Sequence, residues 1–263
     1  MDLGLSGKTV IVTGGGQNIG WGISMAFAKE GVNLVIADLD DVQAQKAADK
    51  AKSLGAKDAI VVKTDVTDYA NVESMVKKAI DTYGSVDVLV NNVGFDVMMP
   101  FTKTTPDFWD KLIAVNYKGM LNCTKAVLDP MIAQGKGVII STGSEAGRIG
   151  EAKEAVYSGL KGAVIAFSKA IARENGPKGI RVNTVCPALT VPEDDEQMAP
   201  NSPWRKQLEM FTPDVIAQIA KGYPLRRVGK GSDIGNAVVF LASDAASFIT
   251  GQTLSVSGGY SMV

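Results

Sequence analysis

Short apolar runs alternate with amphipathic helical patterns over the first two thirds of the 263-residue chain. The run Val10-Ile11-Val12 is β-branched and apolar without alternation, which predicts a strand buried on both faces of a parallel sheet. Further strands are predicted at 32–38, 59–63, 86–91, 137–142 and 180–185, and helices at 19–31, 42–54, about 72–80, 106–131 and 152–174. This alternation indicates a right-handed, doubly wound α/β fold, whose ligand lies at the carboxyl ends of the strands.

The alternation stops after the sixth predicted strand, over residues 191–227. Several prolines and an acidic run surround a set of larger apolar side chains there: Trp204, Leu208, Met210, Phe211 and Ile216. A long irregular segment beside an active site is usually a lid over the substrate, and residues 191–227 are called the lid segment below. The alternative is a surface excursion that packs its own side chains. Because no linker divides the chain, we expect one domain over residues 1–263.

Charge and composition exclude several kinds of protein. The 27 basic and 28 acidic side chains nearly cancel, so we expect no nucleic-acid partner and no membrane partner. The chain has no histidine and only two cysteines, which excludes a Ser-His-Asp triad and gives no reason to expect a metal. Cys123 and Cys186 are far apart, as in a protein with reduced thiols. Without a signal-peptide pattern or a membrane-spanning apolar run, the sequence predicts a cytoplasmic protein.

The first predicted strand ends in a glycine-rich turn, Gly14-Gly15-Gly16-Gln17-Asn18-Ile19-Gly20, which opens into a helix. Glycines let the chain turn sharply and present backbone N–H groups at the helix N-terminus, where the helix dipole favours a phosphate. Taken alone, such a stretch is as often an ordinary loop. Its position between a predicted strand and a predicted helix favours the phosphate site.

Asp38 ends the second predicted strand, 24 residues after Gly14. An acid at about this spacing accepts a hydrogen bond from the ribose 2′-hydroxyl of NAD and repels the 2′-phosphate of NADP. No lysine or arginine occupies 14–22 or 39–41 to hold that phosphate, so NAD is the expected cofactor. The alternative is that Asp38 only caps the following turn.

Tyr157 and Lys161 stand four residues apart and therefore share one face of a predicted helix. A tyrosine titrates near pH 10, so a tyrosine base near neutrality needs its pKa lowered by about 3 units, which a nearby ammonium and an oxidised nicotinamide together can supply. Ser144 follows the fifth predicted strand, where its hydroxyl can hold a substrate oxygen. These three groups suit hydride transfer, in which Tyr157 takes the alcohol proton and the nicotinamide takes the hydride. A surface tyrosine and lysine on a helix are the ordinary alternative.

Taken together, these motifs resemble the short-chain dehydrogenase/reductase family over nearly the whole chain. The residues that carry the resemblance are Thr13-Gly14 with Gly20, Asp38, Asp65-Val66, Asn91-Asn92-Val93-Gly94, Asn116, Ser144, Tyr157 with Lys161, and Pro187. The resemblance implies a seven-stranded Rossmann-type sheet and a nicotinamide cofactor. It also implies a homotetramer, or a heterotetramer with a related subunit, in which the helices at 106–131 and 152–174 pair.

The same resemblance assigns further roles. Asp65 and Val66 would flank the adenine, and Lys161 would hold the nicotinamide ribose as well as lower the pKa of Tyr157. Asn116 would expose its backbone carbonyl at a helix kink and fix a water in a proton relay to Lys161. The other expected cofactor contacts are Gly14, Gln17, Asn18, Ile19, Leu39, Asn92, Gly94, Pro187 and Thr190.

Three residues depart from the family pattern. Asn18 stands where the second glycine of the turn is usual, and asparagine tolerates the left-handed conformation best after glycine. Ala188 replaces the glycine of a Pro-Gly pair, and Pro192 replaces a threonine that commonly bonds the nicotinamide carboxamide; Thr190 is a nearby hydroxyl that can substitute. We expect this cofactor site to differ from its relatives at Asn18.

The substrate pocket is expected between the lid segment and the chain after the fourth strand. Apolar side chains follow that strand, and arginines flank the lid segment; the candidate substrate residues are Phe95, Met98, Trp204, Arg205 and Arg226. Such a pocket, with basic groups outside it, would accept a small molecule such as a coenzyme A (CoA) thioester, although solvated surface charge explains the arginines equally well. Within the family, Glu154–Tyr157 and Ile249–Gly259 resemble 2-hydroxycyclohexanecarboxyl-CoA dehydrogenases, which implies oxidation of a ring-bearing β-hydroxyacyl-CoA.

Three other functions are open. The first is oxidation of a free cyclic or aryl secondary alcohol, and the second is a nucleotide-binding pseudoenzyme subunit. The third is enoyl reduction, suggested by Asn18-Ile-Gly-Trp-Gly22, although the tyrosine and lysine of enoyl reductases stand more than four residues apart.

Overall fold

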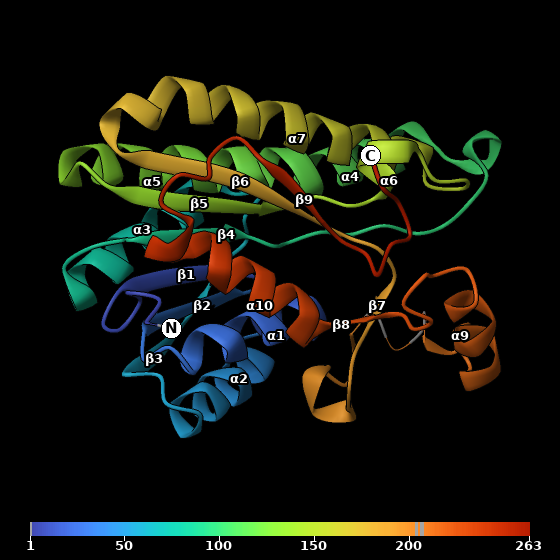
Figure 1. Ribbon diagram of the computed structural model, residues 1–263, viewed down its shortest axis with the longest axis horizontal. Coiled ribbons are helices and arrows are strands. Elements are labelled where there is room, and N and C mark those ends of the chain that lie inside the picture. The colour runs from blue at the N-terminus through green and yellow to red at the C-terminus, as the bar shows by residue number, and fades with distance from the viewer. Residues whose placement is uncertain (1, 203–204, 206–207) are drawn as a thin grey trace.

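The computed structural model describes residues 2–202, 205 and 208–263, and it confirms a doubly wound parallel sheet (Figure 1). The seven strands lie in the order β3-β2-β1-β4-β5-β6-β9, and all pairings are parallel. Their bounds are β1 Thr9–Thr13, β2 Asn33–Asp38, β3 Asp58–Lys63, β4 Val88–Asn91, β5 Gly137–Thr142, β6 Ile180–Pro187 and β9 Thr253–Val256. The strand order reverses between β1 and β4, which is where ligands bind in such sheets.

Helices cover both faces of the sheet (Figure 1). One layer contains α1 (Asn18–Ala28), α2 (Asp41–Ser53) and α10 (Gly231–Ala242), and the other contains α3 (Tyr69–Tyr83), α5 (Gly119–Gln134) and α7 (Ala155–Asn175). Val10 and Val12 pack into the first layer, whereas Ile11 packs into the second. Successive side chains of a strand point to opposite faces, so a strand between two layers must be apolar throughout.

The helix predicted at 106–131 is interrupted. It consists of α4 (Pro106–Ile113), a π-helical turn η2 (Ala114–Lys118) and α5. In η2 the N–H of Gly119 donates to the carbonyl of Ala114, five residues back. The turn inserts one extra residue, which an apolar period of 3.6 does not reveal. The turn includes Asn116, the residue at which the kink is expected.

The chain after β6 leaves the sheet. Two-residue strands β7 (Thr190–Val191) and β8 (Gly229–Lys230) pair in parallel and bring the two ends of the lid segment together. The lid segment contains a short turn η4 (Asp195–Gln197) and a helix α9 (Pro213–Ala220) beyond the carboxyl edge of the sheet (Figure 1). Thr212 caps α9 through its hydroxyl, which accepts from Val215 N at 3.4 Å, so the lid segment is less irregular than predicted.

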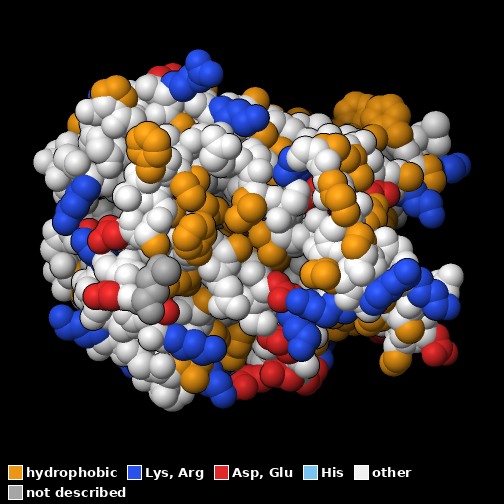
Figure 2. Space-filling model, in the orientation of Figure 1, with side chains coloured by type: hydrophobic (Ala, Val, Ile, Leu, Met, Phe, Trp, Pro, Cys, Tyr) orange, Lys and Arg blue, Asp and Glu red, His pale blue; other side chains and the backbone are white. Residues whose placement is uncertain are grey.

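Short elements complete the described chain. They are η1 (Phe101–Lys103), α6 (Ala146–Ile149), η3 (Gly176–Lys178) and η5 (Asp244–Ala246). Basic and acidic side chains are mixed on the face drawn in Figure 2, with basic ones gathered over the lid segment. Within the described ranges, no helix is long and apolar enough to cross a membrane, and no three acidic, cysteine or histidine side chains are grouped for a metal ion.

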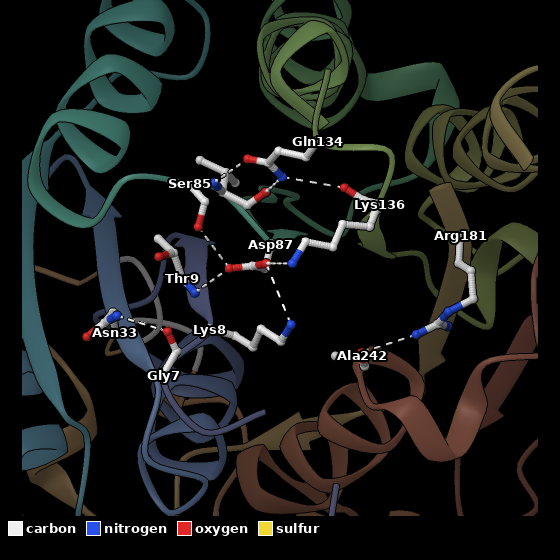
Figure 3. Close-up of polar contacts among 11 residues, drawn as sticks. Gly7, Lys8, Thr9, Asn33, Ser85, Asp87, Gln134, Lys136, Arg181 and Ala242 are labelled. Carbon is white, nitrogen blue, oxygen red and sulfur yellow. Dashed lines mark hydrogen bonds and ion pairs between the residues drawn. The ribbon is translucent and has the colours of Figure 1, made fainter. Parts of the chain in front are cut away.

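Asp87 is the centre of a polar network at the amino ends of β1, β4 and β5 (Figure 3). Its carboxylate accepts from Thr9 N at 2.9 Å and from the Ser85 hydroxyl at 3.1 Å. The ammonium groups of Lys8 and Lys136 lie 4.0 Å and 3.7 Å from it. This buried carboxylate therefore joins the starts of neighbouring strands on the side of the sheet away from the glycine turn.

Candidate active site

The glycine-rich turn has the geometry that its sequence predicts. Gly14 has φ +62°, in the left-handed region that favours glycine. A Cβ at Gly20 would lie 1.9 Å from the carbonyl oxygen of Gly14, so only glycine lets α1 pack this closely on the turn. Asn18 begins α1 with φ +42°, as expected for an asparagine in place of a glycine.

Asp38 lies against this turn. Its carboxylate accepts from Gly16 N at 3.0 Å and from Asp40 N at 3.1 Å. Burial raises the pKa of Asp38, although these backbone hydrogen bonds oppose the increase. Leu39, next to it, is exposed. The carboxylate is thus placed beside the glycine-rich turn, as its spacing from Gly14 predicts.

The other residues expected near the cofactor have clear structural contacts. Asn92 donates to the carbonyls of Thr13 and Gly14, both at 3.1 Å, and so attaches the end of β4 to the glycine turn. Asp65 accepts from Thr67 N at 2.8 Å, whereas Val66 is buried under α5. The assignment of Asp65 and Val66 to the adenine stays a prediction.

The three catalytic candidates come together at the carboxyl end of β5. Tyr157 and Ser144 share a hydrogen bond, and the Ser144 hydroxyl also accepts from Ala146 N at 3.1 Å. Lys161 is buried one helical turn beyond Tyr157 on α7, and its ammonium donates to the carbonyl oxygen of Thr142 at 2.7 Å. Its Nζ lies 5.4 Å from the centroid of the Tyr157 ring.

Burial controls the proton affinities of these groups. Burial raises the pKa of Tyr157, and the charges of Glu154 and Asp96 raise it further, whereas the hydrogen bond to Ser144 lowers it. Burial lowers the pKa of Lys161 to about 8. The pKa of Tyr157 is therefore not depressed in the protein alone, because its own burial and the neighbouring carboxylates outweigh the hydrogen bond to Ser144.

Asn116 is fixed in η2 beside Lys161. Its side chain accepts from Phe95 N at 3.0 Å and donates to the carbonyls of Phe95 and Leu112, at 2.7 Å and 3.0 Å. A Cβ at Gly94 would lie 3.2 Å from Asn116 Oδ1 and 3.6 Å from Lys161 Nζ. Gly94 thus lies between the two polar groups of the predicted relay.

Comparison with known proteins agrees with this geometry. A family model described as Enoyl-(Acyl carrier protein) reductase matches residues 14–261. Oxidoreductase UcpA of Salmonella typhimurium is 36% identical over 257 residues, covering 97% of this chain and 95% of its own. A 3-oxoacyl-[acyl-carrier-protein] reductase FabG of Staphylococcus aureus (strain Mu50) is 33% identical over 256 residues, covering 97% and 98%. An oxidoreductase of Thermotoga maritima, described as uncharacterized, is 33% identical over 261 residues, covering 99% and 100%. The chain belongs to the short-chain dehydrogenase/reductase family.

The end of β6 shows how this short-chain dehydrogenase/reductase accommodates its departures from the family pattern. The carbonyl of Pro187 accepts from Glu145 N at 3.0 Å, which joins β6 to the chain after Ser144. The Thr190 hydroxyl is buried and donates to the carbonyl of Ala188 at 3.0 Å. This bond uses the hydroxyl proton, so in this arrangement Thr190 can offer a ligand only its acceptor lone pairs.

Beside Tyr157 lies a pocket with two carboxyl groups that sequence reasoning missed. Asp96 and Glu154 line it together with apolar side chains of the loop after β4 and of α4: Val97, Met99, Phe101, Phe108 and Leu112. Burial and the charges of Asp96 and Glu151 raise the pKa of Glu154 to about 7. The sequence held one clue to Glu154, which is that it stands three residues before Tyr157.

The candidate substrate residues are only partly brought together. Phe95 packs edge-on against Phe108, 6.5 Å between centroids, and Lys111 Nζ lies 4.5 Å from the centroid of the Phe95 ring. Met98, on the same loop, is exposed. Trp204 lies outside the described residues.

The two arginines bond within or beside the lid segment. Arg205 pairs with Asp195 at 2.7 Å and donates to the carbonyl of Ala199 at 2.8 Å, and Arg226 donates to the carbonyl of Lys221. Both guanidinium groups are therefore already engaged, and whether they bind substrate stays a prediction.

Proposed function

We propose that this protein oxidises a secondary alcohol to a ketone with NAD as the hydride acceptor. The observation that carries the proposal is the placement of Ser144, Tyr157 and Lys161 at the carboxyl edge of the sheet, at the end of β5, with only β4 between β5 and the strand that leads into the glycine turn. Tyrosine and lysine four residues apart on one helix favour alcohol–ketone chemistry over enoyl reduction. The intact set also speaks against a pseudoenzyme subunit.

The residues present fit a dinucleotide. The turn from Gly14 to Gly20 opens into α1 without an acidic residue in its first turn, so the helix N-terminus can accept an anion. Asp38 has its carboxylate beside the turn, where it suits a ribose hydroxyl and opposes a 2′-phosphate. When bound, oxidised nicotinamide accepts the hydride and supplies positive charge near Tyr157.

The chain's own residues then handle the proton. The Ser144 hydroxyl holds the alcohol oxygen, and the Tyr157 phenolate accepts the alcohol proton. The bond from Lys161 to Thr142 fixes the ammonium beside the tyrosine, and Asn116, held by Phe95 and Leu112, is the residue that would fix a water of the proton relay to Lys161. The apolar pocket beside Tyr157 limits access of water to the reacting carbon.

For the substrate we propose a ring-bearing β-hydroxyacyl-CoA. A relative named for 3-oxoacyl thioester reduction supports the class, because a β-hydroxyacyl thioester is the reduced partner of such a substrate. The aromatic side chains of Phe101 and Phe108 in the pocket suit a ring. A free cyclic or aryl secondary alcohol is the alternative, and the internal bonds of Arg205 and Arg226 favour it.

A substrate screen tests these proposals. Ring-bearing β-hydroxyacyl-CoA thioesters and the corresponding free alcohols are offered with NAD or NADP, and formation of the reduced cofactor is followed by absorbance. We expect oxidation with NAD and a higher kcat/KM for the thioesters. Equal kcat/KM for thioesters and free alcohols would contradict the thioester proposal alone, whereas no oxidation of any secondary alcohol would contradict the function.

The cofactor preference has its own test. Asp38→Ser removes the charge that opposes a 2′-phosphate, so the kcat/KM ratio for NADP over NAD is expected to rise by about tenfold or more, since a hydrogen bond to a charged group contributes roughly 1.5–3 kcal/mol. Asp40→Ser is the matched control, because Asp40 caps α2 through Gln43 N and does not contact the glycine turn. An unchanged ratio in Asp38→Ser would contradict the role of Asp38.

We further propose that the protein is cytoplasmic and assembles as a homotetramer, or as a heterotetramer with a related subunit. The layer of α4, α5 and α7 is the surface for this pairing (Figure 1). Light scattering of the purified chain should give a mass near four times 27.7 kDa if it assembles alone.

A further inference from the structure

Asn18 is the exception among the buried asparagines of this protein. It is 2% exposed, and neither Oδ1 nor Nδ2 of its side chain has a hydrogen-bond partner among the described residues. By contrast, both amide atoms of Asn116 and of Asn183 are bonded. A buried amide without partners costs free energy, which a folded protein tolerates where a ligand supplies the missing bonds.

The position of Asn18 indicates which ligand that is. It is the first residue of α1, and the preceding residue, Gln17, makes no side-chain cap to the helix N-terminus. In the dinucleotide-binding turn, the second glycine lets the backbone approach the pyrophosphate closely. Here that position carries the side chain of Asn18, at the helix N-terminus that such a turn presents to the pyrophosphate.

The lid segment lies next to the same place. Ala199 N donates to Gln17 Oε1 at 3.3 Å, and Gln43 Nε2 donates to the carbonyl of Glu196 at 2.8 Å. The carboxylates near the turn have partners of their own, since Asp38 accepts from Gly16 N and Glu196 lies 3.7 Å from Lys50. Among the described residues neither carboxylate accepts from the Asn18 amide, so its N–H groups are without a protein acceptor.

We propose that the side-chain amide of Asn18 binds the cofactor directly, with Nδ2 donating a hydrogen bond to a pyrophosphate oxygen. This rests on the proposed function, because it assumes a dinucleotide in the site. The substitution of glycine by asparagine then replaces close backbone approach by a side-chain donor. In the ligand-free protein the amide without partners lowers the stability of the fold, and the hydrogen bond to the bound pyrophosphate removes this loss.

Asn18→Gly tests the proposal with binding and stability, without any turnover. Glycine accepts the positive φ and removes the unsatisfied amide, so the melting temperature of the ligand-free protein should be equal to or above that of the unmodified protein. Affinity should change in the opposite direction. Fluorescence titration should show about tenfold weaker binding of NADH and of ADP-ribose, since the lost bond is to a charged group. Adenosine, which lacks the pyrophosphate, should bind equally to both proteins.

Asn18→Asp sharpens the test because it keeps the shape and adds a negative charge. It should weaken ADP-ribose binding more than Asn18→Gly does. A lower melting temperature of Asn18→Gly with unchanged affinity for ADP-ribose would show a structural role and overturn the proposal. Equal losses for adenosine and ADP-ribose would also overturn it. If the unmodified protein binds neither NADH nor ADP-ribose, the proposed function fails, and with it this role of Asn18.

Discussion

The two edges of the central sheet treat their buried polar groups differently. At the amino edge, the carboxylate of Asp87 has two hydrogen-bond donors and two ammonium groups around it (Figure 3). At the carboxyl edge, several buried atoms have no partner among the described residues, including Asn18 Nδ2, Thr142 Oγ1 and Glu145 Oε1. Both edges belong to the same strands, so the difference is in what surrounds the strand ends.

The difference indicates that the polar groups of the amino edge stabilise the fold, whereas those of the carboxyl edge serve the reaction. A buried polar group without a protein partner costs about 1–3 kcal/mol, so each one calls for an explanation, such as an ordered water, a bound ligand or a role in a reaction. Among the described residues, Asp87 and the side chains that contact it have no unpartnered buried atom, and this network holds the strand starts together. The carboxyl edge has the perturbed proton affinities of Tyr157, Lys161 and Glu154, as expected for a site prepared for proton transfer.

The largest effect is expected from Tyr157→Phe, which removes the hydroxyl at the carboxyl edge and keeps the ring. Because general base catalysis contributes roughly 10²–10⁴-fold, kcat for alcohol oxidation should fall by about that factor. NADH affinity and melting temperature should change little. Stopped-flow or steady-state absorbance measures kcat. Fluorescence titration measures the NADH affinity, and thermal melts measure the melting temperature.

Tyr223→Phe is the matched control for this substitution. Tyr223 is also buried near the carboxyl edge, and its hydroxyl accepts from Leu189 N at 3.2 Å; among the described residues it has no hydrogen bond with Ser144 or Lys161. We expect its kcat to stay within about threefold of the unmodified protein, since a neutral hydrogen bond contributes roughly 1 kcal/mol. Equal losses in Tyr157→Phe and Tyr223→Phe would contradict a base at Tyr157.

The next effect is on the other edge, where Asp87→Asn should lower stability and spare the active site. An amide cannot balance Lys8 and Lys136, and it offers one acceptor atom instead of two. The free energy of unfolding should fall by about 1–3 kcal/mol, measured by denaturant titration, while NADH affinity is unchanged. If Asp87→Asn changed the NADH affinity and left the free energy of unfolding unchanged, Asp87 would serve the active site and not the stability of the fold.

Much of this comparison can be predicted from the sequence, because the relevant signals are local. Unalternated apolar runs such as Val10–Val12 reveal strands between two layers, and the spacings from Gly14 to Asp38 and from Tyr157 to Lys161 place chemistry at the strand ends. What could not be predicted depends on contacts between distant segments. The ammonium of Lys161 is directed at Thr142, and Arg205 is engaged by Asp195, neither of which any periodicity shows.

Glu154 is such a case, and Glu154→Gln gives the smallest expected effect. Its pKa is about 7, raised first by burial and then by the charges of Asp96 and Glu151. Above that pH the Glu154 carboxylate raises the pKa of Tyr157, so removing its charge should make the phenol easier to ionise. The acid limb of the kcat/KM profile for alcohol oxidation should therefore move to lower pH, by less than about one unit for partly exposed groups.

The shift must also depend on pH and on position. Below pH 7 Glu154 is increasingly protonated, so Glu154→Gln and the unmodified protein should converge there. Glu174→Gln, an exposed acid near the far end of α7, should leave the profile unchanged. A shift toward higher pH, or the same shift in Glu174→Gln, would show that Glu154 does not act on Tyr157. The raised pKa of Tyr157 would then be due to burial first and to the charge of Asp96.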